Sequence, residues 1–399
     1  MTDSTPKMMR LLLFNFSYAL VMTMFRLMVP LYMEASGYEP VVIGTLLSSH
    51  AFISALAALW APRLVLRFPF RQVLGAGITV FMLGCLTFGA TSDLVFLFAG
   101  QLLTGLSSVF VMIAAQSYVA QISPASQVSR NFSWWVSAFG VAGIIGPTLA
   151  GWLVLRFDYW WTFVTIALIG SLAFVTSRLF SDARLEGAGP SGELNLTNVR
   201  YLLDRRRYRA GLVMTVTDIT VLTLSMSFLP LYLASAGLGT AVIGMLLSLR
   251  SLGEVVAPLS VRTVERLVGR WRLLVATLIS GLVLLVVVPS LQGVGQLAIA
   301  ALLLGITTGF VAPLSMAMIS ESVEKGKRAL ALGVRSTINR TTGTVAPALY
   351  GSVINSWSYG AAFYLCAAYV GLVLWYTVRS RELIVPQEEA GDLSQLAGD

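Results

Sequence analysis

Seven ionisable side chains stand inside long apolar stretches of this sequence, where each would cost roughly 2.5–3.5 kcal/mol to place in a lipid bilayer. They are two carboxylates, four arginines and the only histidine: Asp218, Glu254, Arg26, Arg250, Arg335, Arg340 and His50. Groups this costly at depth are candidates for function by default. Their chemistry would be the exchange of protons and the binding of a charged substrate.

The two carboxylates are the leading candidates for proton exchange. Removal from water favours the protonated form of a carboxylate and a nearby arginine favours the ionised form, so relative movement would switch the proton on and off. Asp218 comes first because it lies about 13 Å from the inner end of its predicted helix at 1.5 Å per residue. Glu254 comes second. His50 is a third candidate because histidine titrates near neutral pH, although a histidine among apolar residues is more often a packing residue.

A purely structural role for these charges is the alternative. Arg250 and Glu254 are four residues apart, so they share one helix face and can pair. Asp218 can pair with Arg335 or Arg340, because a buried charge needs a partner whatever its function. Both interpretations are open for each residue.

The same charges indicate a class of substrate. Four arginines against two carboxylates leave two surplus positive charges. If these side chains face a cavity, organic anions or phosphate-bearing amphiphiles are favoured over cations. The candidate substrate or cavity residues are Arg26, Arg250, Arg335, Asn339, Arg340, Gln101 and Tyr232.

The composition places these residues in a membrane protein. Of 399 residues, 56% are hydrophobic and 12% charged, with mean hydropathy +0.79. Soluble domains carry about 25% charged residues, so this chain could not cover a surface facing water. The net charge of +8 would suggest nucleic acid in a soluble protein, but here it is interpreted as membrane topology and no nucleic-acid partner is expected. One histidine and two cysteines cannot build a usual zinc site.

The apolar runs predict an all-α protein with twelve transmembrane helices. The predicted spans are 11–33, 40–62, 73–91, 94–119, 131–155, 160–180, 209–234, 240–261, 273–290, 294–320, 329–355 and 360–378. With both termini inside, 22 of the 27 basic residues fall in cytoplasmic segments and only Arg156 in an external loop. This alternation agrees with the positive-inside rule, so we predict cytoplasmic N and C termini.

The sequence repeats itself at a fixed offset of 200 residues. The segment 30–37 recurs at 230–237, Ile43-Gly44 and Leu46-Leu47-Ser48 recur at 243–248, and the segment 143–151 is matched by 343–351. A duplicated six-helix unit is the simplest cause. We predict an N-terminal bundle over 1–180, a cytoplasmic linker over 181–208, a C-terminal bundle over 209–379 and a polar cytoplasmic tail over 380–399. Residues 198–207 are predicted as either a basic helix at the headgroups or a solvated linker.

Two parallel six-helix halves joined by a long loop resemble the major facilitator superfamily. That resemblance implies pseudo-symmetric bundles that rock around a central substrate site. The fifth span is similar to the motif of drug:proton antiporters that ends in Gly-Pro-x-x-Gly-Gly, here Gly146-Pro147-Thr148-Leu149-Ala150-Gly151. Small residues allow close helix contact and proline bends a helix, which suits a hinge. The hinge candidates are Gly143, Gly146, Pro147, Gly151, Gly343, Pro347 and Gly351, although ordinary helix packing would use the same residues.

Other motifs of that family are incomplete. The loop after the second span has Arg63, Arg67 and Arg71 but lacks the family's acid and glycine, whereas the second half keeps Glu265, Arg266, Gly269 and Arg270 as a candidate cytoplasmic latch. Gln101 stands where drug:proton antiporters carry an arginine in the fourth helix, which argues against a standard member of that branch.

The sequence therefore predicts a proton-coupled secondary transporter in the cytoplasmic membrane, more an exporter than an importer, for a small amphipathic or anionic compound. The alternatives are an importer or uniporter of a metabolite anion, a lipid flippase, and a non-transporting receptor on the same fold. No enzyme is expected, no cofactor or metal is expected, and the absence of a Walker loop excludes direct drive by ATP. The expected partners are the substrate, protons and the bilayer, and the protein is predicted to be monomeric.

Overall fold

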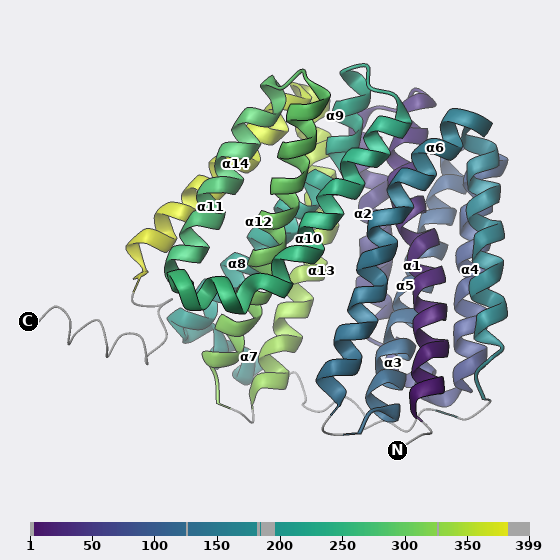
Figure 1. Ribbon diagram of the computed structural model, residues 1–399, viewed down its shortest axis with the longest axis horizontal. Coiled ribbons are helices and arrows are strands. Elements are labelled where there is room, and N and C mark those ends of the chain that lie inside the picture. The colour runs from purple at the N-terminus through teal and green to yellow at the C-terminus, as the bar shows by residue number, and fades with distance from the viewer. Residues whose placement is uncertain (1–3, 125–126, 182–183, 185–195, 325–326, 382–399) are drawn as a thin grey trace, which may run out of the picture. The chain divides into compact units, whose positions relative to one another are not determined.

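A computed structural model describes residues 4–124, 127–181, 184, 196–324 and 327–381. The described residues of the first half form six helices (Figure 1): α1 (Ser4–Ala35), α2 (Pro40–Ala57), α3 (Ala61–Arg67), α4 (Phe70–Ala90), α5 (Leu94–Ile122) and α6 (Val128–Ser177). Later helices are α7 (Leu196–Asp204), α8 (Arg206–Thr223), a π-helical turn Leu224–Phe228, α9 (Leu229–Ser235), α10 (Thr240–Val268), α11 (Arg270–Val287), a 3₁₀ turn Val288–Ser290, α12 (Val294–Glu321), α13 (Arg328–Ser356) and α14 (Tyr359–Arg379). The fold is all-α, as predicted.

Ten of the described helical segments are long and apolar enough to cross a membrane. One of them is the 48-residue segment Arg130–Ser177. It contains two helices that meet at Asp158, whose φ of 73° is not helical. The predicted span 329–355 coincides with α13, which is long but less apolar and is not among the ten. The protein is a multi-pass membrane protein, and the number of twelve spans and the position of the termini stay predictions.

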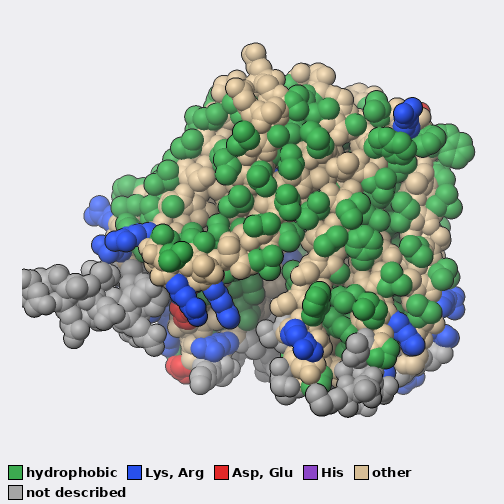
Figure 2. Space-filling view, viewed as in Figure 1, with side chains coloured by type: hydrophobic (Ala, Val, Ile, Leu, Met, Phe, Trp, Pro, Cys, Tyr) green, Lys and Arg blue, Asp and Glu red, His purple; other side chains and the backbone are tan. Residues whose placement is uncertain are grey.

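Figure 2 shows hydrophobic side chains spread over the middle of the face, whereas most of the Lys and Arg side chains visible there lie in its lower part. This is the pattern of a surface that faces lipid along the middle of its helices. Aromatic packing forms part of the interior. The Phe25 ring on α1 lies 5.5 Å from Phe81, 5.2 Å from Phe88 and 6.0 Å from Phe163, measured between centroids.

The helix bounds follow the 200-residue repeat. α2 begins at Pro40 and α10 at Thr240, α5 at Leu94 and α12 at Val294, α6 at Val128 and α13 at Arg328. Three helices of the second copy thus start at the residues that the 200-residue repeat predicts.

The two halves differ at the end of their second membrane span, which is α2 in the first half and α10 in the second. The span predicted over 40–62 ends early, because α2 stops at Ala57 and α3 starts only at Ala61. The physical reason is Pro62, which lacks a backbone N–H and whose ring clashes with the carbonyl four residues earlier. The repeat places Arg262 at this position, and α10 continues without a break to Val268.

The described residues form two compact units that do not coincide with the two sequence halves. One unit comprises the described residues within 1–191, 223–252 and 343–359, and the other those within 192–222, 253–342 and 360–399. In the second unit, Leu202 of α7 and Tyr208 of α8 are fully buried against Ile319 and Ala331. Within the predicted linker, the segment Leu196–Asp204 is therefore a helix that packs on α12 and α13.

Candidate functional site

Helices α2 and α13 cross at backbone contact. A Cβ added to Gly44 would overlap the carbonyl oxygen of Pro347 and lie 3.1 Å from its carbonyl carbon. A Cβ on Gly351 would overlap the Pro40 carbonyl oxygen. Since the neighbours are backbone atoms and cannot swing away, only glycine fits at these two positions.

Helices α6 and α10 cross in the same way, through the residues 200 positions away. A Cβ on Gly244 would overlap the Pro147 carbonyl oxygen and lie 2.9 Å from its carbonyl carbon. A Cβ on Gly151 would overlap the Thr240 carbonyl oxygen. The hinge candidates Pro147, Gly151, Pro347 and Gly351 thus lie at two equivalent helix crossings.

A serine completes each crossing. The Oγ atom of Ser48 accepts a hydrogen bond from the backbone N–H of Ala348 at 3.0 Å, and Ser248 accepts one from Thr148 at 3.1 Å. The Thr148 hydroxyl adds a second bond to Ser248 at 2.8 Å. Proline distorts the local helical hydrogen bonds, so the residue after each proline turns its N–H to a partner on the other helix.

The remaining hinge candidates lie in different surroundings. A Cβ on Gly146 would overlap the hydroxyl of Thr23 on α1, so this glycine serves packing within the first bundle. A Cβ on Gly143 would make only an ordinary contact with Ser251 at 3.8 Å, and Gly343 has no atom within 4 Å of such a Cβ. The crossings are therefore built on Gly44, Gly244, Gly151 and Gly351.

Near one end of these crossings, the Tyr359 hydroxyl donates a hydrogen bond of 2.9 Å to Glu34. The ring of Tyr232, a candidate cavity residue, lies 6.4 Å from that of Tyr359. The equivalent tyrosines of the first half, Tyr32 and Tyr159, lie 5.7 Å apart. Tyr232 is thus part of a repeated aromatic pair at the helix ends.

His50 and Gln101 belong to one polar cluster between α2 and α5. The His50 Nδ1 atom lies 3.3 Å from the Thr104 hydroxyl, which also lies 3.2 Å from Gln101 Oε1. Gln101 is only 3% exposed, and Arg26 on α1 is close enough to His50 to interact with it electrostatically. Three of the predicted site residues therefore lie together in this half.

Asp218 and Arg335 lie together in the second unit. The Arg335 guanidinium donates to the Thr215 hydroxyl at 3.1 Å and to the Ser315 hydroxyl at 3.3 Å, and interacts electrostatically with Asp218. Asp218 is 7% exposed. This arrangement fixes the arginine beside the carboxylate, as either a coupling site or a structural pair requires.

The other charged candidates are placed as follows. Arg340 and Asn339 are half-buried on α13, one turn beyond Arg335. Arg250 is fully buried on α10, and Glu254 lies half-buried one turn further along the same helix. Their proposed pairing stays a prediction.

The candidate latch of the second half is an ionic network around Arg270. Its Nε atom donates to Glu265 at 2.5 Å, and its two terminal nitrogens bind both carboxylate oxygens of Glu321 at 2.5 and 3.1 Å. Gly269 makes the turn between α10 and α11 with φ 81° and ψ 149°, a conformation essentially restricted to glycine. Arg266 is exposed on the last turn of α10.

Glu321, Thr215 and the two serines are site residues that the sequence did not predict. Glu321 is the last residue of α12, and a carboxylate that closes an apolar run was the one available signal. Ser48 and Ser248 stood within the repeated segments, but their role arises only from helix pairing. Among the described residues, no group of three His, Cys, Asp or Glu side chains could hold a metal ion.

Fold and site together define a multi-pass helical membrane protein built from two related halves. The chain matches the model of the Major Facilitator Superfamily twice, over residues 11–253 and 211–397, and therefore belongs to this superfamily of transporters, which are not enzymes. It is similar to multidrug resistance protein 2 of Bacillus subtilis, at 28% identity over 148 residues that make up 37% of each chain. It is also similar to multidrug resistance protein MdtG of Dickeya zeae, at 26% identity over 280 residues covering 66% of this chain and 69% of that protein.

A third relative is the probable transport protein HsrA of Haemophilus influenzae, of which the match covers 24%. Across these three curated relatives, the match covers between 24% and 69% of the relative's length. Among solved structures, the nucleoside transporter NupG superposes with a TM-score of 0.77 over 93% of this chain and 98% of its own, at 12% identity. At that identity the likeness shows the fold alone.

Proposed function

We propose that this protein is a secondary active transporter that exports a small amphipathic or anionic compound in exchange for protons, by alternating access. The observation that carries the proposal is the pair of equivalent crossings, α2 with α13 and α6 with α10. Each joins a helix of one sequence half to a helix of the other. A transporter that rocks its halves needs such contacts to form and separate in step.

The chemistry of the crossings suits reversible closure. Backbone-to-backbone contact at glycine leaves no side chains to interlock, and each crossing adds a hydrogen bond from a backbone N–H to a serine hydroxyl rather than an ion pair. A hydrogen bond of this kind contributes about 1 kcal/mol, so both crossings can open at a modest cost. If the N-terminus is cytoplasmic, as the basic residues indicate, the crossings close the outer side.

Proton coupling is assigned to Asp218 first and Glu254 second. Asp218 is buried in α8, and its neighbour Arg335 on α13 is held by Thr215 of the same helix α8 and by Ser315 of α12. Movement of α13 relative to α8 would therefore change the distance between carboxylate and guanidinium, which changes the affinity of the carboxylate for a proton. Energy is sufficient, because one proton falling through ~100 mV supplies about 2.3 kcal/mol and one pH unit roughly 1.4.

Export is supported by the printed names of two relatives, both multidrug resistance proteins. An anionic preference is supported by the surplus of arginines among the intramembrane charges, Arg26, Arg250, Arg335 and Arg340. A guanidinium group does not lose a proton at physiological pH, so these positive charges are permanent.

The test is pH-driven flux in proteoliposomes with Asp218→Asn and Glu254→Gln. The Asp218→Asn variant should lose the tenfold accumulation that each pH unit supports and keep substrate counterflow, since exchange of substrate for substrate needs no proton. Glu39→Gln, an exposed carboxylate that makes no capping bond to α2, is the matched control and should transport normally.

The outcomes separate the alternatives. Undiminished proton dependence in both variants would refute the coupling mechanism. Anion flux that does not depend on pH would indicate a uniporter. Movement of phospholipid between leaflets would indicate a flippase, and binding without flux would indicate a receptor. The anionic preference would be refuted if the purified protein bound lipophilic cations tightly and did not bind organic anions.

A further inference from the structure

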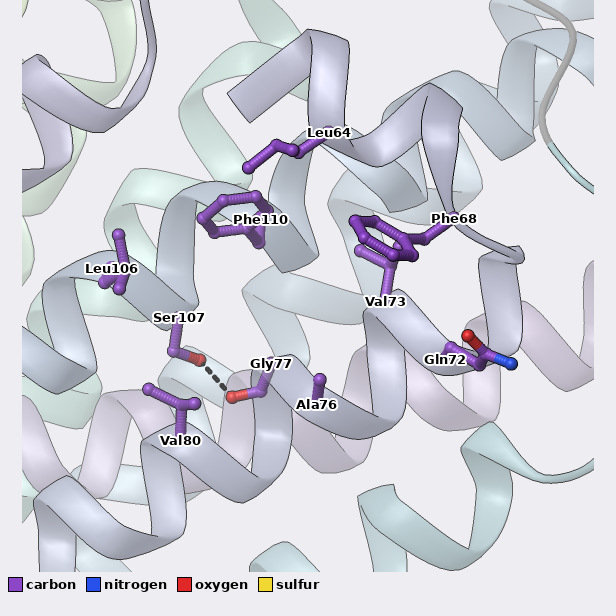
Figure 3. Close-up of a pocket in the computed structure, with 10 residues that line it drawn as sticks. All are labelled: Leu64, Phe68, Gln72, Val73, Ala76, Gly77, Val80, Leu106, Ser107 and Phe110. Carbon is purple, nitrogen blue, oxygen red and sulfur yellow. Dashed lines mark hydrogen bonds between the residues drawn. The ribbon is translucent and has the colours of Figure 1, made fainter. Parts of the chain in front are cut away.

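An apolar pocket of about 340 Å³ opens between α3, α4 and α5. Figure 3 shows its lining side chains, which come from the short helix α3, the first half of α4 and the middle of α5: Leu64, Phe68, Gln72, Val73, Ala76, Gly77, Val80, Leu106, Ser107 and Phe110. Its volume falls in the range of sites that bind small molecules, roughly 300–1,000 Å³. None of these residues belongs to the crossings or the charged clusters described above.

The pocket offers almost nothing to a polar ligand. Its one buried polar side chain, Ser107, donates its hydroxyl proton to the Gly77 carbonyl oxygen at 2.6 Å. Gln72 is exposed at the end where α4 begins. Since a buried polar group without a partner costs free energy, the matching occupant of the inner part is a hydrocarbon chain.

The break between α2 and α3 shapes this pocket. Pro62 ends the continuous helix, so α3 leaves the line of α2 and places Leu64 and Phe68 beside α4 and α5. The Trp60 ring, at the break, lies 5.4 Å from the ring of Phe110 in the pocket wall. Tryptophan is enriched at the membrane interface, which places the break near the headgroups.

Positive charge flanks the pocket at this end. Arg63 and Arg67 are exposed on α3, four residues apart and hence on one face, and each directly precedes a lining residue. Arg71 follows in the first turn of α4, and the backbone of Arg184 pairs with that of Pro69 in the connecting loop. The sequence has no Asp or Glu between residues 40 and 92.

The equivalent position of the second half carries an ionic network. There Arg270 is neutralised by Glu265 and Glu321. The equivalent residues of the first half are Phe70, Val65 and Gln121, which carry no charge.

Aromatic packing takes the place of that ionic network. The Phe70 ring stacks on Tyr118 with centroids 4.2 Å apart and meets Phe180 edge-on at 5.1 Å. The first half therefore lacks all three members of that network, and its own arginines at this end, Arg63 and Arg67, stand where the second half has Thr263 and Leu267.

We propose that this pocket is a binding site for an anionic phospholipid, with one acyl chain between α3, α4 and α5 and the phosphate held by Arg63, Arg67 and Arg71. The arginines attract an anionic headgroup, and the hydrocarbon fills the apolar pocket. Under the predicted topology this end lies in the cytoplasmic leaflet, where anionic lipids are enriched. The site is independent of the direction of transport and of proton coupling.

The test is native mass spectrometry of the full-length protein with phosphatidylglycerol and phosphatidylcholine of identical acyl chains. Wild type should retain phosphatidylglycerol preferentially. Arg63→Gln with Arg67→Gln should lower its affinity about 25-fold, since each basic residue near an anionic membrane surface contributes roughly fivefold. The double variant Arg262→Gln with Arg272→Gln removes the same charge from exposed positions of the second half and should bind normally.

A second pair of variants tests the pocket itself. Ala76→Phe fills it from an exposed position of α4 and should displace the lipid, whereas Leu83→Phe, exposed on the same helix outside the pocket, should not. Equal retention of the two lipids by wild type would overturn the proposal. So would normal phosphatidylglycerol binding in both the arginine and the Ala76 variants, or loss of binding to the same extent in the two control proteins.

Discussion

Replacing Gly44 by alanine should push the protein out of the conformation described here. The new Cβ would overlap the Pro347 carbonyl oxygen and lie 3.1 Å from both the Pro347 carbonyl carbon and the Gly351 Cα. Carbon atoms pack best at about 3.5–4.0 Å, so α2 and α13 must separate by roughly 0.4–0.9 Å. Overpacking of this size costs about 1–3 kcal/mol.

This cost applies only to the conformation in which the crossing is packed. The gain in helix propensity on replacing glycine by alanine, up to about 1 kcal/mol, is the same in both conformations and cancels between them. The packed conformation should therefore lose population by about 5- to 150-fold relative to the open one. Gly244→Ala should act equally, since its Cβ would lie 2.9 Å from the Pro147 carbonyl carbon.

The assay is electron–electron distance measurement between spin labels on Glu39→Cys and Trp357→Cys, at the ends of α2 and α13. Both native cysteines, Cys85 and Cys366, are buried, so labelling is selective. A population at longer distance should appear in Gly44→Ala and not in Gly281→Ala, where a Cβ has no neighbour within 4 Å. Unchanged distance distributions in Gly44→Ala would show that the crossing does not move.

The turn and the ionic network of the second half give two further predictions. Gly269→Ala should lower the free energy of unfolding by about 1–3 kcal/mol, because φ 81° with ψ 149° strains any residue with a side chain; thermal unfolding in detergent would show it, and an unchanged midpoint would contradict it. Arg270→Lys should cost about 1–2 kcal/mol, because lysine cannot bind both oxygens of Glu321, which is itself partly exposed and screened. The exposed Arg266→Lys is its control, and equal effects of the two changes would refute the specific role of Arg270.

Helix positions followed closely from the sequence because the bilayer leaves few options. An apolar run of about 20 residues must satisfy its backbone internally, so it forms a helix that ends where charge or Gly/Pro returns. The exception is the span that was expected to reach residue 62. Its apolar character continues past Ala57, and hydropathy carries no information about the ring of Pro62.

The candidate site was predictable residue by residue but not as an arrangement. Burial cost alone identified Asp218 and Arg335 as functional candidates, whereas their shared partners Thr215 and Ser315 are common polar residues of membrane helices. The contact of Ser48 with Ala348 joins residues 300 positions apart. Such a contact depends on helix packing, which a single sequence does not contain.

The replacement of an ionic network by stacked rings makes the two halves respond differently to their solution. Salt weakens the bonds of Arg270 to Glu265 and Glu321, because dissolved ions screen the charges. The packing of Phe70 on Tyr118 and Phe180 contains no charge for them to act upon. The ionic network of the second half should therefore loosen as salt rises, whereas the ring packing at the equivalent position of the first half should not.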